Sequence, residues 1–250
     1  MPLHYPVLLL RKKSALPAWL SMKTTVVLLA ISLLLAASSQ AAEPARSKIK
    51  RFVQQVVLGP EFGSNRKVAS RWMTAPTLSV FGATPEQKAV VQEVVTTINP
   101  SLKAQIGEIQ LLPDNAKEAT MKVYFAPLQD FPKIARDNGA EVKKGNIGYF
   151  WMFWDEKNAM TSTGVLLASD KLRGAELKHF AFEEITQSLG LAEDADEFPE
   201  SIFYSRGSNG GAAARPSALD LQLLQWFYQH VLPGDDRKAI SAKFEATWPK

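Results

Sequence analysis

The order of helix-like and strand-like segments constrains the fold of this chain more than any other feature of its sequence. Apolar residues recur with helical spacing in some segments and with the alternation of strands in others, and four strands follow one another between two helices. Predicted helices cover Lys48–Leu58, Glu86–Ile98, Gly174–Gly190 and Ser217–His230. Predicted strands cover Thr77–Phe81, Ala104–Leu112, Met121–Ala126, Tyr149–Trp154 and Gly164–Ser169. Such grouping predicts an α+β domain in which helices pack on a sheet.

The amino-terminal segment has the features of a secretory signal. Residues 22–42 read MKTTVVLLAISLLLAASSQAA, in which a lysine precedes an apolar run and SQA forms a small-residue cleavage site. We therefore expect residues 1–41 to be a signal peptide, with Met22 as an alternative start. Residues 42–250 are expected to form one domain that is exported to the periplasm or secreted, without a stable membrane span after cleavage.

Charge and cysteine content exclude several classes of protein. The chain has 29 basic and 25 acidic residues, but four of the basic residues and none of the acidic ones precede residue 42. The expected domain therefore carries 25 of each, and nothing in this balance indicates nucleic-acid binding. Because the chain has no cysteine, disulfides, thiolate metal sites and cysteine nucleophiles are excluded, and the hydrophobic core must hold the fold.

The aromatic run Tyr149–Trp154, YFWMFW, has large apolar side chains at every position. Alternation places them on both faces of a strand, which predicts a central strand that is covered on both sides. A stacking platform for sugars or peptides is the alternative interpretation.

One predicted helix carries the polar residues best suited to a functional site. In HFAFEEITQSLGLAED, residues 179–194, four-residue steps place His179, Glu183 and Gln187 on one helix face. Glu184 is the residue directly after Glu183 on this largely apolar helix. Two adjacent carboxylates need compensating interactions if they are buried. Neighbouring carboxylates raise one another's pKa, which is how acid and base groups are often tuned. An ordinary solvated pair of His179 and Glu183 is the alternative interpretation.

The same segment resembles the active-site helix of zincin metallopeptidases, H-E-x-x-H, and more closely its metzincin extension H-E-x-x-H-x-x-G-x-x-H. The three histidine positions of that pattern hold Glu183, Gln187 and Glu193 in this chain. Glu184 takes the position of the general base, and Gly190 that of the glycine at which the chain turns. The resemblance therefore implies a zincin helix that has lost its histidines.

Two further segments extend the resemblance. Ser201–Tyr204, SIFY, is similar to the metzincin Met-turn, and Leu219-Asp220 is similar to the start of the helix that closes matrix-type members. The chain also resembles a family of exported bacterial proteins of unknown function with the signature E-E-L-T-Q-A-L-G-L-x-N-D, here at Glu183–Asp194. Together these likenesses imply a metzincin-like fold, with a mixed twisted sheet of about four to five strands, an active-site-like helix and a C-terminal helix.

The donor atoms at these positions disfavour zinc. Only His179 and His230 remain among the histidines of the expected domain, and zinc prefers nitrogen and sulfur to the oxygens of Glu183, Gln187 and Glu193. Such a set favours an oxygen-preferring divalent metal such as calcium, magnesium or manganese, with His179 as an alternative ligand.

Three functions are open from the sequence. The missing histidines favour a non-peptidase binding protein of the cell envelope, a pseudoenzyme with a periplasmic peptide, glycan or protein as its partner. Retention of Glu184 favours a metal-dependent, peptidase-like hydrolase in which this carboxylate is the general base that activates water. The third is a structural envelope assembly protein that uses the surface around Trp151 and Trp154.

Overall fold

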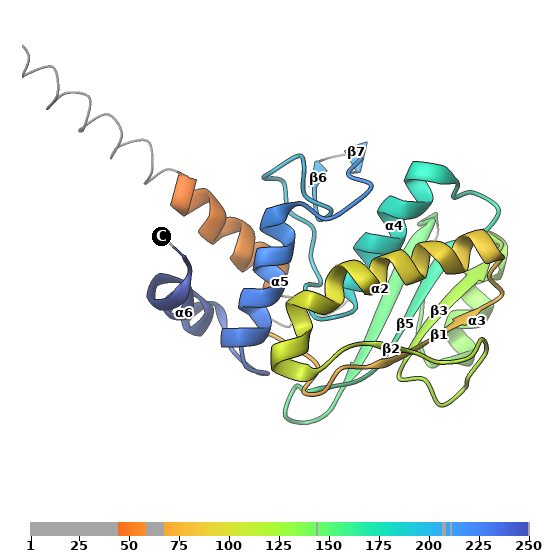
Figure 1. The fold of residues 1–250 in the computed structure, drawn as a ribbon, viewed down its shortest axis with the longest axis horizontal. Helices are drawn as coiled ribbons and strands as arrows, with labels where there is room; N and C mark the ends of the chain where they lie inside the picture. Colours follow the sequence, from red (N-terminus) through yellow and green to blue (C-terminus); the bar gives the residue numbers. More distant parts are fainter. Residues whose placement is uncertain (1–44, 59–67, 144, 207–208, 211, 250) are drawn as a thin grey trace, which may run out of the picture. The chain divides into compact units, whose positions relative to one another are not determined.

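The structure of the chain is a computed structural model that describes residues 45–58, 68–143, 145–206, 209–210 and 212–249 (Figure 1). The expected signal peptide and the Gly59-Pro60 pair, which follows the first predicted helix, lie outside these ranges. The chain divides into two compact units, Met1–Ser47 and Lys48–Lys250. Of the first unit, residues 45–47 are described, and they are helical. The second unit carries the fold described below.

A mixed sheet of five strands, in the order β2-β1-β3-β5-β4, lies at the centre of the larger unit. The strands are β1 (Thr77–Phe81), β2 (Gln110–Leu111), β3 (Met121–Ala126), β4 (Gly148–Trp154) and β5 (Met160–Ala168). Four of them run parallel, and β4 pairs antiparallel with β5. Val123 of β3 pairs with Val80 and with Val165, and all three side chains are buried. The expectation of an α+β fold with four to five strands in a mixed sheet is confirmed.

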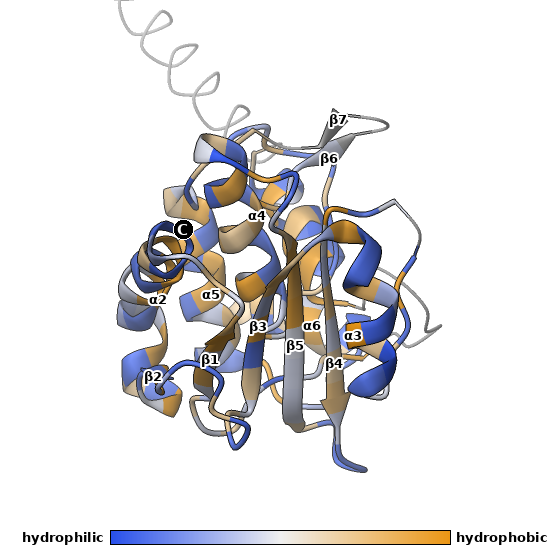
Figure 2. Ribbon diagram, turned by 90° about the vertical axis from the view of Figure 1, so that its right-hand side faces the viewer, coloured by the Kyte–Doolittle hydropathy of each residue, from blue (hydrophilic) through white to orange (hydrophobic). Residues whose placement is uncertain are grey.

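Helices pack against this sheet, with α2 and α4 on the same side of it (Figures 1 and 2). The described helices are residues 45–57, α2 (Pro85–Ile106), α3 (Phe131–Asp137), α4 (Gly174–Gln187), α5 (Ala218–His230) and α6 (Arg237–Thr247), with a 3-10 turn η1 (Leu128–Asp130) before α3. Contacts join α2 to both α4 and α5, and α4 to β4 and β5. Among the described residues, none of the helices combines the length and apolar character needed to cross a membrane.

Helix α2 is longer than predicted, because Pro100 lies inside it instead of ending it. An interior proline removes a backbone hydrogen bond and costs about 3 kcal/mol. Ile98 and Leu102, on either side of Pro100, are fully buried in the core, and each such side chain contributes about 1.5–3 kcal/mol. Burial of the second half of the helix therefore outweighs the local signal to stop.

The strand predicted over Ala104–Leu112 is wrong, because its first residues belong to α2. Of this range, β2 is the part that pairs in the sheet. The side chain of Asn99 binds both backbone groups of Ile109, at 2.9 Å to the nitrogen and 3.2 Å to the oxygen. Side-chain hydrogen bonds thus replace ladder bonds at the point where a strand was expected.

The aromatic strand β4 lies at the edge of the sheet, so the prediction of a central strand is wrong. Its first half is buried, whereas Phe153 in the second half is 39% exposed. Trp151 stacks on Tyr124 at 6.2 Å and covers Gly164 of β5, where any added side chain would clash with the indole. The space at Gly164 lets the Trp151 side chain lie across the sheet.

The predicted terminal helix begins where the sequence indicated, and another helix follows it. Ser217 is the N-cap of α5, and its hydroxyl accepts a hydrogen bond from the backbone nitrogen of Asp220. The unpredicted helix α6 packs on α5 through Trp226, whose ring lies 6.2 Å from that of Phe244 and 5.5 Å from that of Trp248. The C-terminal helix of the expected fold is therefore extended by a further element.

Candidate functional site

The end of α4 is fixed by side chains from two distant segments. Trp72 Nε1 donates to the carbonyl oxygen of Ser188 at 3.2 Å, and the Tyr228 hydroxyl donates to that of Leu189 at 2.7 Å. The guanidinium of Arg71 lies over the Tyr228 ring at 4.7 Å. Carbonyls at the end of a helix lack partners within it, so these bonds hold α4 in one position on the sheet.

Gly190 then turns the chain back along α4. Its φ is +107°, and a side chain there would clash with the backbone oxygen of Ser70 and approach the Phe227 ring at 3.1 Å. A glycine is therefore required at this turn. The turn leads the following loop back to the polar face of α4.

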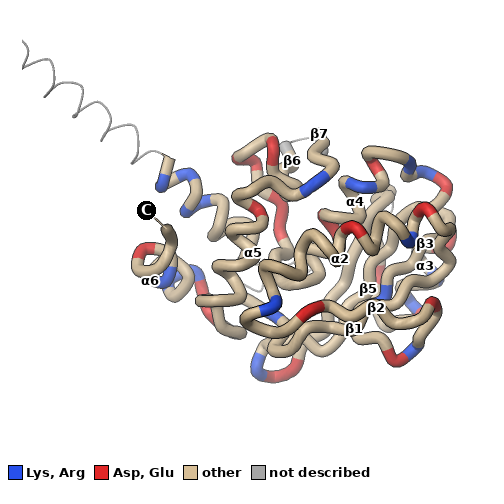
Figure 3. Tube along the Cα trace, in the orientation of Figure 1, with Lys and Arg blue, Asp and Glu red and all other residues tan. Residues whose placement is uncertain are grey.

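A cavity of about 620 Å³ opens beside this face of α4. Its walls come from α4, from residues 145–148 leading into β4, and from the segment that contains Ser205 of β6 (Ser205–Arg206), a strand paired with β7 (Asn209–Gly210). The ionisable residues that line it are Glu176, His179, Glu183, Glu184 and Asp194. No lysine or arginine of the described chain lines it, and Figure 3 shows several acidic residues between α4 and β6. The cavity is therefore acidic.

His179 and Glu183 form a buried pair in this cavity. His179 Nε2 lies 3.3 Å from Glu183 Oε2, and Nδ1 lies 2.9 Å from the carbonyl oxygen of Ala213. Because a carbonyl oxygen only accepts, Nδ1 carries a proton, and a second proton is shared between Nε2 and Oε2. The two residues are 4% and 8% exposed, so the interpretation of a solvated pair is wrong.

Burial and mutual contact shift the pKa of both partners. Burial raises the pKa of the Glu183 carboxyl, and the hydrogen bond from His179 opposes this. For His179, burial lowers the pKa, but the hydrogen bond and charge of Glu183 outweigh burial, so that the pKa lies above its ordinary value. The pair therefore holds its shared proton more firmly than isolated side chains would.

A second polar pair lies next to the first. Gln187 Nε2 donates to Asp194 Oδ1 at 3.0 Å. Burial raises the pKa of the Asp194 carboxyl, and hydrogen bonds from Ser205 and Gln187 oppose this. Glu193, the predicted ligand position, does not line the cavity, and its backbone nitrogen donates to the Val56 carbonyl at 3.3 Å. The sequence singled out Glu193, but the turn of the backbone brings Asp194, and not Glu193, to the cavity wall.

Glu184, the predicted general base, lines the same cavity and is 4% exposed. It lies against Gly148 at the start of β4, where an added Cβ would clash with Glu184 Oε1 and with the Phe180 ring. The bare backbone at Gly148 therefore lets strand and helix approach and leaves the carboxylate at the cavity wall. Sequence reasoning missed Gly148, because its role depends on a contact between distant segments.

The directions of the donor side chains decide whether this site can hold a metal ion. Within the described ranges, no group of three or more histidine, cysteine, aspartate or glutamate side chains is arranged to hold a metal ion. His179 is directed at Glu183, and Gln187 at Asp194, so these side chains bind each other. The arrangement does not fit zinc. An oxygen-preferring ion held by Glu183, Gln187 and Glu193 stays a prediction.

The pKa values of the two histidines of the described chain are expected to shift in opposite directions from the ordinary value. The pKa of His179 lies above 6.5 because Glu183 outweighs burial, and that of His230 lies below 6.5 because burial and then Lys243 lower it. A raised folded-state pKa means that the stability from His179 is present below the unfolded pKa and is lost as pH rises through the folded one. Imidazole NMR resonances followed against pH measure both values.

The variant Glu183→Gln provides the control for this titration. It should lower the pKa of His179, because the carboxylate that raises it is removed, and leave that of His230 unchanged. A His179 that titrates below His230, or that ignores the substitution, would contradict the buried pair.

The fold and site define an α+β domain with an acidic cavity beside one helix. The sequence matches the family described as "Protein of unknown function (DUF2927)" over residues 46–245, and the chain belongs to this family. No curated protein matches the chain. Among solved structures it is similar to one titled "Structure of myroilysin", with 11% identity, a TM-score of 0.38, and coverage of 65% of this chain and 97% of that one. The expectation of a family of unknown function is confirmed, and its residue signature stays a prediction.

Proposed function

We propose that this chain is an exported, zincin-like domain that binds a ligand in the cavity beside α4 and does not act as a zinc peptidase. The observation that carries the proposal is the pairing of polar side chains that line the cavity. His179 binds Glu183, and Asp194 binds Gln187, which does not itself line the cavity. A catalytic zinc site needs three protein ligands that converge on one ion. A ligand site needs a concave surface with a few fixed polar groups, and hydrogen bonds already fix these four side chains.

The place of this activity is part of the proposal. The signal-like segment at residues 22–42 supports export to the periplasm or the outside of the cell. The ligand is then a peptide, glycan or protein of the envelope. Function of this kind resides in the site and not in the fold, so the inactive zincin helix serves here as the wall of a binding cavity.

A hydrolase is the second candidate, favoured by the position of Glu184. Its carboxylate lines a cavity large enough for a substrate, and the bare backbone of Gly148 makes room for it. A general base must reach the proton that it removes, and a carboxylate at the wall of such a cavity meets this condition. In this case Glu184 would take a proton from water as the water attacks the substrate.

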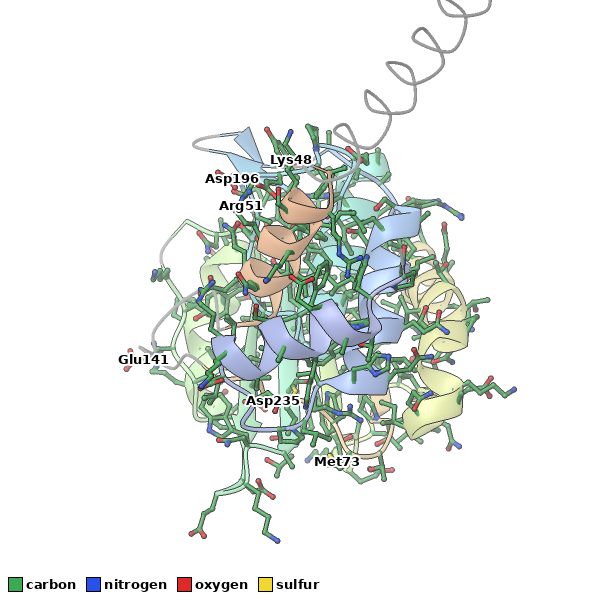
Figure 4. All side chains as sticks on the ribbon, turned by 90° about the vertical axis from the view of Figure 1, so that its left-hand side faces the viewer. Lys48, Arg51, Met73, Glu141, Asp196 and Asp235 are labelled. Carbon is green, nitrogen blue, oxygen red and sulfur yellow. The ribbon has the colours of Figure 1, made fainter. Side chains whose placement is uncertain are left out.

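One set of variants separates binding from hydrolysis. The wild-type protein, Glu184→Gln and the control Glu141→Gln are compared for cleavage of peptide and glycan libraries and for ligand-induced shifts in melting temperature. Glu141 suits the control because it is exposed and does not line the cavity (Figure 4).

Binding predicts thermal shifts with the wild type and with Glu141→Gln, and no turnover in any of the three proteins. Turnover that disappears in Glu184→Gln and persists in Glu141→Gln would establish the hydrolase and overturn the binding proposal. Gly148→Ala should abolish the thermal shifts, because the new Cβ displaces Glu184 and Phe180 into the cavity. Ligand shifts that survive Gly148→Ala would place the binding site elsewhere.

A further inference from the structure

A second cavity, of about 880 Å³, adjoins the acidic one. It is bounded by η1, by the start of α3, and by residues 142–143, 145–146 and 170–171. Gly145 and Asn146 line both cavities, so the two are neighbours at this short segment, and we refer to them together as the cleft. A cleft of this length accommodates an extended ligand better than a compact one.

The two halves of the cleft differ in chemistry. The acidic half presents the carboxylates of Glu183, Glu184 and Asp194, and its described lining contains no basic residue other than His179. The second half has an apolar wall, and it is also lined by Lys143 and by the ion pair of Lys171 and Asp170. The apolar lining residues are Pro127, Leu128, Phe131, Pro132 and Val142. Buried carboxylates attract a cation more strongly than they would in water, and an apolar wall favours a hydrocarbon stem.

Gln187 is the hydrogen-bond partner of Asp194, one of the acidic residues of this half. Its side chain is 1% exposed, and its Oε1 accepts no hydrogen bond from the described residues. The amide nitrogen of the same side chain donates a hydrogen bond to Asp194, which lines the cavity. Gln187 itself does not line the cavity, so its hydrogen bond holds the Asp194 carboxylate at the cavity wall.

We propose that this cleft binds an organic cation carried on an apolar stem. The ammonium or guanidinium group lies among Glu183, Glu184 and Asp194, the stem crosses Gly145 and Asn146, and the apolar end occupies the second cavity. This inference rests on the proposed function, since it names the ligand class of the same site. A neutral sugar offers no charge to these carboxylates, and an anion is repelled by them. Basic peptides and free alkylamines share the required chemistry.

The test uses ligands with similar hydrocarbon chains whose head groups are cationic, neutral or anionic. Dissociation constants of the purified protein are measured by calorimetry for hexylamine, its neutral counterpart hexan-1-ol, and hexanoate. A basic tripeptide with an apolar residue and spermidine then distinguish the two sources of the cation. The ring signals of His179 report whether each ligand enters the acidic half.

Two pairs of matched variants locate the contacts. Asp194→Asn is compared with Asp196→Asn, whose exposed side chain lies outside the cleft near Arg51 (Figure 4). Leu128→Asn is compared with Leu232→Asn, because Leu232 is 56% exposed and lines neither cavity.

We expect Asp194→Asn to weaken hexylamine binding about ten- to hundredfold and to leave hexan-1-ol unchanged. Leu128→Asn should weaken the binding of both hexylamine and hexan-1-ol by about tenfold. The two control variants should leave the binding of both ligands unchanged. Binding of hexan-1-ol or hexanoate as tightly as hexylamine would overturn the cationic ligand while leaving the proposed function intact. If none of these ligands moves the His179 signals, the cationic ligand is overturned, while the proposed function depends on the peptide and glycan libraries.

Discussion

Replacement of Gly190 by alanine is expected to remove about 3–5 kcal/mol from the free energy of unfolding, enough to leave a marginally stable domain unfolded. The positive φ of +107° disfavours any side chain, and the new Cβ would clash with the backbone oxygen of Ser70. Backbone cannot move aside as a flexible side chain can, so strain and steric overlap add. Urea denaturation followed by circular dichroism measures the loss.

Gly174→Ala is the matched control. Gly174 also has a positive φ, +52°, but no atom lies within 4 Å of an added Cβ. The same substitution there should cost only about 1–2 kcal/mol, the penalty of the left-handed backbone region alone. Equal losses at the two positions would show that close packing against Ser70 has no part in fixing the turn after α4.

Replacement of Asp220 by alanine is expected to cost about 3–5 kcal/mol of stability. This carboxylate is 1% exposed and accepts hydrogen bonds from Ser201 Oγ at 2.6 Å, Ile202 N at 3.1 Å and Ser217 N at 2.7 Å. It therefore ties the SIFY turn to the start of α5. Alanine would leave three donors without this acceptor, two of them in buried bonds and that of Ser217 part-buried. Chemical denaturation measures the loss.

Asp236→Ala tests whether the effect of Asp220 is only that of a helix cap. Asp236 is the N-cap of α6, it is exposed, and it accepts a hydrogen bond from Ala239 N at 2.8 Å. Loss of such a cap should cost about 1 kcal/mol. A loss at Asp220 no larger than that at Asp236 would contradict its role as the link between turn and helix.

Local patterns predicted the elements whose signals lie within a few residues. The bounds of β1 and β3 follow from alternating apolar residues, and Ser217 marks the start of α5 because its capping partner Asp220 is three residues away. Helix α6 was missed because only Ile240 and Phe244 among its residues are buried, which leaves a weak apolar stripe. The predicted helix over Glu86–Ile98 was too short, because burial of Leu102 carries α2 past Pro100.

The candidate site also has parts that the sequence predicted and parts that it did not. The four-residue step from His179 to Glu183 is local, so the sequence placed the two side chains together, and the structure adds that they are buried. Asp194 and Gly148 escaped prediction because their roles depend on where the chain turns at Gly190 and where β4 meets α4. A helix can be identified from its spacing, but a cavity needs the packing of distant segments.

The central claim is that the cavity beside α4 binds an organic ligand and not zinc. Imidazole NMR of the purified protein tests it directly, because His179 lines the cavity and His230 does not. One equivalent of zinc should not shift the signals of either imidazole ring. Hexylamine should shift the His179 signals and leave those of His230 in place. One equivalent of zinc that shifts His179 at saturation, with no response to hexylamine, would contradict the account.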